Sequence, residues 1–81
     1  MSYPRIDLVK TGQNISRLRR RAGYSVRDLQ RELGLGLGSP QSIYKWQAGT
    51  ALPSIDNLVA LAALFGVQLD DILAVEQADG R

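Results

Sequence analysis

The stretch from Ser39 to Gly49 places hydrogen-bonding side chains around two apolar anchors. Ser39 can cap a helix, and Pro40 suits the first helical position, where its missing N–H costs nothing. Ile43 and Trp46 stand three residues apart, so one helix face carries both and can dock on a core. The side chains off that core are an amide, a hydroxyl, a phenol and an ammonium, those of Gln41, Ser42, Tyr44 and Lys45. Gln can pair with an adenine edge and Lys with a guanine edge or a phosphate, which suits a helix inserted into a DNA major groove.

The composition excludes most catalytic chemistry. The 81 residues include no histidine and no cysteine, which rules out a serine–histidine triad, a cysteine protease, a zinc finger and a zinc hydrolase. The acidic residues are scattered, so we predict no enzymatic activity, no metal and no cofactor. The hydrophobic fraction of 44% is ordinary for one globular domain. No long apolar run suggests a signal peptide or a membrane span, and a cytoplasmic protein is the expectation.

The small net charge of +2 hides a strong asymmetry along the chain. Residues 1–47 hold nine basic and three acidic residues, a net charge of +6. Residues 48–81 hold one basic and five acidic residues, a net charge of −4. A basic half that contains the candidate DNA-contacting helix is typical of a polyanion binder, although a solvated charged face would look similar.

Helical patterns fill most of the sequence. A lead-in over residues 1–10 is expected to pack as a short extension or a single turn. Thr11 is the predicted cap of a first helix that runs to about Ala22, with Gly23 as its stop. Ser25 caps a second helix that ends near Leu33, with an acidic third position completing a capping box. Its inner positions, and those of the first helix, are Ile15, Leu18, Val26, Leu29 and Leu33.

Glycine-rich and proline-containing segments separate the remaining helices. Residues 34–38 hold three glycines and must form a turn. The third helix follows over about residues 40–47. Ser54 caps a fourth helix that ends near Phe65, and its apolar positions cover more than one stripe, so we expect it to be the most buried helix. A fifth helix over about residues 69–75 and a frayed tail over residues 76–81 close an all-α, compact five-helix bundle.

The order of these motifs resembles the phage-repressor and Cro-type helix-turn-helix family, also called Xre-like regulators. The matching segments, over about residues 11–75, are Gln13-Asn14-Ile15-x-x-Leu18-Arg19, Gly23-x-Ser25-x-x-x-Leu29, Leu33-Gly34, Ile43-x-x-Trp46, Leu52-Pro53-Ser54-x-x-x-Leu58 and Leu61-Ala62-x-x-Phe65-Gly66-Val67-x-Leu69-Asp70-x-Ile72-Leu73. The resemblance implies a lambda-repressor-like DNA-binding domain over residues 11–75, whose third helix enters the major groove.

The family's functional positions can be carried over one by one. The resemblance implies base contacts from Pro40, Gln41 and Lys45. It also implies contacts with the DNA backbone, from the N–H groups that begin the second helix, from the third helix and from the loop after it. The residues concerned are Ser25, Arg27, Ser39, Ser42, Tyr44, Gly49 and Thr50.

Three positions depart from the family pattern. Val26 stands where the family commonly has Gln, and Arg27 is the candidate substitute for the lost polar contact. Gln47 stands where the family has a Glu that pairs with Arg19, so a hydrogen bond to a neutral amide is expected in place of an ion pair. The turn between Gly34 and Ile43 is about three residues longer than usual, which could shift the pose of the third helix.

Structural interpretations compete with the functional ones. We expect Ile43 and Trp46 to be core residues and Arg19 to be structural, and Tyr44 could contact a phosphate or pack on its own helix. Arg20 and Arg21 could form only a solvated face. The turn residues Leu35 and Leu37 could be fillers or an apolar contact for another chain.

The sequence therefore predicts a sequence-specific regulator that binds a double-stranded DNA operator, as a homodimer at least on DNA. Dimer contacts would come from the fourth and fifth helices, the tail or the lead-in. The alternative is an antitoxin-like or adaptor module that uses the same fold to bind an acidic protein.

Overall fold

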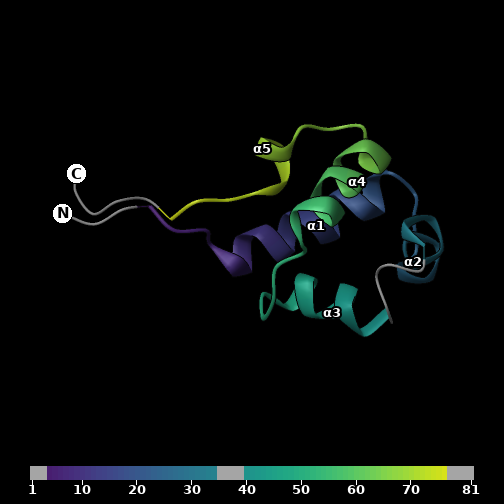
Figure 1. Ribbon diagram of the computed structural model, residues 1–81, viewed down its shortest axis with the longest axis horizontal. Helices are drawn as coiled ribbons and strands as arrows, with labels where there is room; N and C mark the ends of the chain where they lie inside the picture. Colours follow the sequence, from purple (N-terminus) through teal and green to yellow (C-terminus); the bar gives the residue numbers. More distant parts are fainter. Residues whose placement is uncertain (1–3, 35–39, 77–81) are drawn as a thin grey trace.

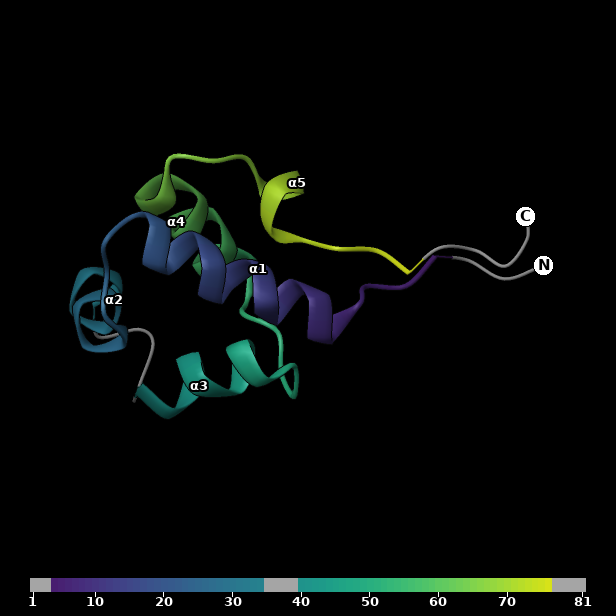
Figure 2. The same cartoon turned by 180° about the vertical axis from the view of Figure 1, so that it is seen from behind.

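The computed structural model describes residues 4–34 and 40–76 (Figure 1). The five helices of this part are α1 (Leu8–Arg21), α2 (Val26–Leu33), α3 (Pro40–Ala48), α4 (Ile55–Phe65) and α5 (Leu69–Ile72). Helix α1 lies in the middle, with α4 and α5 on one side of it, α3 on the other, and α2 at the end away from the termini (Figures 1 and 2). The all-α bundle predicted from the sequence is confirmed.

Every helix contributes to one core. Among the described residues, the buried apolar side chains are Ile15, Leu18, Leu29, Ile43, Trp46, Leu58, Leu61, Ala62 and Ile72. Val26 and Leu33 are half-buried and pack against this cluster. The rings of Tyr24 and Phe65 pack in a tilted arrangement, with centroids 6.4 Å apart. This contact joins the loop after α1 to the end of α4.

The predicted ends of α2 and α4 are confirmed. The Ser54 side chain accepts a hydrogen bond from the Asn57 N–H and so caps α4. Gly66 ends the same helix with φ at +70°, a left-handed conformation that glycine adopts without a side-chain clash. In α2, Ser25 forms the expected capping box with Asp28. Gly34 ends α2, and residues 35–38 of the predicted glycine turn lie outside the described part of the chain.

The predicted start of the first helix is wrong. Helix α1 begins at Leu8, and its cap is Asp7, whose carboxylate accepts a hydrogen bond from the Lys10 N–H at 2.9 Å. Thr11 is instead buried inside α1, and its hydroxyl oxygen accepts a hydrogen bond from the Ala74 N–H. Asp7 and Thr11 stand four residues apart, and either could cap the helix. Because the Thr11 hydroxyl accepts a hydrogen bond from Ala74, 63 positions further along the chain, Asp7 is the cap.

The expectation that α4 is the most buried helix is also wrong on one face. Ile55 is 72% exposed and Val59 is 53% exposed, although both carry large apolar side chains. The two stand four residues apart and therefore share one exposed strip, which lies beside the buried side chains of Leu58, Leu61 and Ala62.

The chain ends form an extended pair that the sequence did not predict. Helix α5 stops at Ile72, earlier than expected, and residues 73–76 run back alongside the start of α1 (Figures 1 and 2). The Asp7 N–H donates to the Ala74 carbonyl at 2.8 Å, and the Glu76 N–H donates to the Arg5 carbonyl at 2.7 Å. These bonds make an antiparallel bridge between Ile6 and Val75. We call residues 4–7 and 74–76 the terminal ribbon. Glu76 is thus paired and not frayed, and residues 77–81 lie outside the description.

Candidate nucleic-acid interface

Helix α3 has a buried back and a polar front. Ile43 and Trp46 are buried, as the sequence predicted. Gln41, Tyr44 and Lys45 are exposed, and their spacing of three and four residues places them on one face. Ser42 is half-buried on the flank of that face. The structure therefore brings an amide, a phenol and an ammonium together on one exposed surface.

A close approach between α1 and α3 holds this front in place. A Cβ atom built on Gly12 would lie 2.3 Å from the carbonyl oxygen of Trp46 and 2.7 Å from that of Gln47. Only glycine lets the two backbones come this near, and the contacted atoms belong to the backbone of α3 itself. The position of α3 thus depends on Gly12, a residue that the sequence analysis did not single out. The signal available was a glycine inside a helical pattern, which costs about 1 kcal/mol relative to alanine and therefore calls for a packing reason.

Arg19 joins the C-terminal end of α3 to α1. Its Nε–H donates to the Gln47 Oε1 at 2.8 Å, and a terminal guanidinium nitrogen donates to the Tyr24 carbonyl at 2.6 Å. The hydrogen bond expected from Arg19 to the neutral amide of Gln47 is confirmed. Arg20 donates to the Ser16 hydroxyl, one turn away on the same helix, and stays exposed on the surface of α1.

The loop after α3 turns sharply and uses its own amide groups. Gly49 has φ at +78°, and its N–H donates to the Trp46 carbonyl. The Thr50 N–H and hydroxyl both donate to the Lys45 carbonyl, at 3.0 and 3.2 Å. These bonds satisfy carbonyls at the end of α3. A phosphate contact from Gly49 or Thr50 would therefore compete with existing hydrogen bonds.

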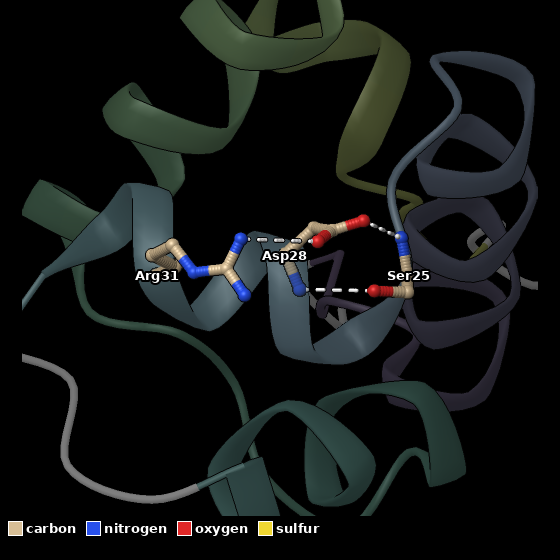
Figure 3. A network of polar contacts seen from close by, with 3 residues as sticks. All are labelled: Ser25, Asp28 and Arg31. Atoms are coloured by element: carbon tan, nitrogen blue, oxygen red, sulfur yellow. Dashed lines mark hydrogen bonds and ion pairs between the residues drawn. The ribbon is translucent and has the colours of Figure 1, made fainter.

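The start of α2 carries a carboxylate as well as free helix N–H groups. The Ser25 hydroxyl accepts from the Asp28 N–H at 3.0 Å, and the Asp28 carboxylate accepts from the Ser25 N–H at 3.2 Å (Figure 3). Arg31 lies 3.4 Å from the same carboxylate (Figure 3). The hydrogen bonds from the Ser25 N–H and hydroxyl lower the pKa of Asp28, and the positive charge of Arg31 adds to this, so Asp28 stays ionised near neutral pH. Arg27, the next candidate phosphate ligand, is exposed on α2.

Two predicted contacts fall outside this geometry. Ser39 is not among the described residues, and the side chain of Pro40 is not described either. The exposed face of α3 also includes Ala48, which the sequence analysis did not name: it follows Tyr44 and Lys45 at a spacing of four and three, on the same face as Gln41. Its methyl group is of the kind that contacts the methyl group of thymine.

Other kinds of site find no support in the described residues. Within residues 4–34 and 40–76, no three acidic side chains gather as metal ligands would. No helix in the same part of the chain is long and apolar enough to cross a membrane.

The fold, together with the exposed polar face of α3, is typical of one class of protein. A family model described as helix-turn-helix matches residues 15–72, so the chain belongs to the helix-turn-helix family, as the resemblance to Xre-like and Cro-type regulators predicted. It is a DNA-binding regulator of that type. Among solved structures, the chain is similar to the restriction-modification controller protein C.AhdI from Aeromonas hydrophila, with a TM-score of 0.70 and 27% sequence identity over 82% of this chain and 96% of that one. No curated protein resembles the chain closely enough to count as a relative.

Proposed function

We propose that the chain binds duplex DNA in a sequence-specific manner, with α3 in the major groove. The observation that carries this proposal is the division of α3 into a buried apolar back and an exposed face with Gln41, Tyr44 and Lys45. Gln41 and Lys45 contact base edges, helped by Pro40 at the start of the helix. Base contacts of this kind specify sequence, whereas phosphate contacts fix the position of the module.

The phosphate contacts come from both sides of α3. Ser25 and Arg27 lie at the start of α2, Ser39, Ser42 and Tyr44 at or beside α3, and Gly49 and Thr50 in the loop after it. Among these groups, the exposed ones are Ser25, Arg27, Tyr44 and Thr50, and this exposure supports their part in the contact. The Asp28 carboxylate reduces the affinity of the α2 terminus for an anion, so Arg27 matters more than the helix N–H groups there.

A homodimer of this module contacts two half-sites about one turn of DNA apart. The protein acts as a regulator and not as an enzyme. Its similarity to a restriction-modification controller protein supports a regulatory role. The binding of an acidic protein by the same fold is the rival function, and no feature of the described residues favours it over DNA.

The test is selection of bound sequences from a random duplex pool at physiological salt, followed by binding measurements with variants. Gln41→Ala and Lys45→Ala should each lower affinity for the selected site by about 1–3 kcal/mol and relax the sequence preference at one position. The matched controls are Gln13→Ala and Lys10→Ala, which remove the same groups from exposed positions on α1. These controls should keep the sequence preference of the wild type.

Two results would contradict the proposal. The first is a selection that enriches no sequence. The second is a pair of α3 variants with the affinity and preference of the wild type. A third measurement is the dependence on salt: the binding constant should fall linearly with salt on a double-logarithmic plot, with a slope of about −0.9 for each phosphate neutralised.

A further inference from the structure

The outer edge of the terminal ribbon is an open β-strand edge. Arg5 and Asp7 point their backbone groups inward, to Glu76 and Ala74. Backbone groups alternate sides along a strand, so the N–H and C=O of Ile6, between them, point outward. Neither group has a hydrogen-bond partner among the described residues. An exposed edge of this kind is a template for pairing with another strand.

The side chains along this edge match a second copy of the same strand. The order Arg5-Ile6-Asp7 places a positive charge, an apolar side chain and a negative charge in succession. An antiparallel copy centred on Ile6 would place Arg5 opposite Asp7 twice, once on each side of a two-fold axis. Opposite charges that face each other across strands are stabilising, and like charges are destabilising.

We propose that two copies of this chain pair through the strand of residues 4–7, in antiparallel register about Ile6, to form a four-stranded sheet. The Ile6 N–H of each copy donates to the Ile6 carbonyl of the other. The two Arg5–Asp7 pairs flank this central ring of hydrogen bonds.

The pairing also covers exposed apolar surface. Ile6 is 39% exposed and Val75 is 52% exposed, and the two face each other across the ribbon, so their side chains lie on the same side. In the four-stranded sheet, they form a continuous row in the order Val75, Ile6, Ile6 and Val75. Each isoleucine thereby gains a neighbour on the side that now faces solvent.

Two features select this edge and this register. The other edge, residues 74–76, would place Glu76 opposite Ala74 in a self-pairing about Val75, with no charge complementarity. On the edge formed by residues 4–7, Pro4 lies opposite Leu8 of the second copy. Leu8 is the first residue of α1, so its carbonyl points along the helix and is not available to an opposing strand. The N–H that Pro4 lacks is therefore not needed in this register, whereas a register shifted along the strand would need it.

This dimer rests on the homodimer in the proposed function and gives that homodimer an interface. The base of the ribbon is also close to α3. A Cβ atom built on Gly49, directly after α3, would lie 2.8 Å from the Val9 Cα. The terminal ribbon thus joins the body of the protein beside the C-terminal end of α3. Pairing of two ribbons therefore determines how the two copies of α3 lie relative to each other in the dimer.

The decisive experiment uses charge reversal in two separate variants. Arg5→Asp leaves two negative charges on the strand, and Asp7→Lys leaves two positive charges. Each variant alone should dimerise at least about tenfold more weakly than the wild type, by sedimentation equilibrium, because like charges meet across the axis. An equimolar mixture should recover the affinity as a heterodimer. Arg17→Asp, the same change at an exposed arginine of α1, is the matched control and should dimerise like the wild type.

Asp7 also caps α1, so the folding of Asp7→Lys is checked by circular dichroism. If that variant does not fold, Ile6→Pro takes its place: it removes the outward N–H and leaves both ribbon hydrogen bonds intact, and it should weaken the dimer. The proposal is overturned if the wild type is monomeric, if the mixture stays monomeric, or if Arg5→Asp and Ile6→Pro both dimerise normally. It is equally overturned if Ile55→Ser with Val59→Ser, on the exposed face of α4, abolishes the dimer while the ribbon variants do not.

Binding to a duplex that holds one half-site separates this proposal from the proposed function. A monomeric ribbon variant should bind the half-site as the wild type does, and should lose only the tighter binding to the two-half-site duplex. Failure of all variants and the wild type to bind the half-site would contradict DNA recognition and leave the dimer result to stand by itself.

Discussion

Arg19 connects three segments of the chain through one guanidinium group. It donates to Gln47 at the end of α3 and to the Tyr24 carbonyl between α1 and α2. The Gln47 amide oxygen is a neutral acceptor in a half-buried site. The guanidinium donor is charged, but the amide brings no opposite charge, so the attraction between opposite charges at this distance is missing. The wild-type side chain therefore holds α3 less firmly than an acid would.

Gln47→Glu should stabilise the fold by about 0.5–1.5 kcal/mol, because the carboxylate adds the attraction of an opposite charge to the hydrogen bond with Arg19. Thermal unfolding at low and high salt measures the gain, part of which should be lost at high salt. Gln13→Glu adds the same charge at an exposed position of α1 and should change stability much less. A melting temperature that is unchanged in Gln47→Glu would contradict this account.

The contribution of Asp28 to stability, through the capping box of α2, depends on its ionisation. Its pKa is lowered in the folded state below the ordinary value of 3.8, by hydrogen bonds from Ser25. A lowered folded-state pKa means that the stabilisation by the charged form is complete above pH 3.8 and is lost as the pH falls through the folded-state value. The difference in stability between the wild type and Asp28→Ala should therefore shrink on acidification below pH 3.8. Denaturant unfolding at a series of pH values measures it, and a difference that does not vary with pH would be inconsistent with ionised Asp28 as the cause.

The helices were predictable from sequence where a local signal decides their ends. Ser25 and Ser54 are followed by helix-forming stripes and act as caps, as expected. The start of α1 and the end of α5 were not predictable, because Thr11 and the residues after Ile72 are fixed by contacts between the two ends of the chain. The Asn14 amide donates to the Ile72 carbonyl, and the Thr11 hydroxyl accepts from Ala74, across 58 and 63 positions. The candidate contact face of α3 followed from its periodicity, whereas the Gly12 contact behind it depends on tertiary packing.

The spacing between α1 and α3 gives a prediction at the scale of the element. Gly12→Ala should favour helix formation by about 1 kcal/mol but push the methyl group against the backbone of α3, and such overpacking costs about 1–3 kcal/mol. We expect net destabilisation in denaturant unfolding, together with weaker DNA binding at temperatures where the variant is fully folded. Gly23→Ala is the control: it strains a backbone with φ at +85° but meets no atom within 4 Å, so folded protein should bind DNA normally. Normal DNA binding by folded Gly12→Ala would show that α3 does not depend on this contact for its position.

The chain separates its charges along the sequence, and the five helices of its described part build one core. The first 47 residues carry the positive charge and include α1, α2 and nearly all of α3, whereas the acidic residues after them that the structure describes are on α4, α5 and the C-terminal strand. Chains of this size bury a modest fraction of their surface and are marginally stable. Ligand binding to the folded state therefore has a large effect on the unfolding temperature.

The selected duplex should raise the melting temperature of the wild type in proportion to its occupancy. At a free duplex concentration 100 times the dissociation constant, binding adds about 2.7 kcal/mol of stability. For a domain of this size, each kcal/mol corresponds to about 4–8 °C. The shift in melting temperature should disappear at high salt, because the release of counterions from the DNA then contributes less free energy to binding. A scrambled duplex of equal length should give a smaller shift, and Lys45→Ala should reduce the difference between the two duplexes. Equal shifts with selected duplex, scrambled duplex and heparin would mean that the basic half binds any polyanion and that α3 does not read sequence.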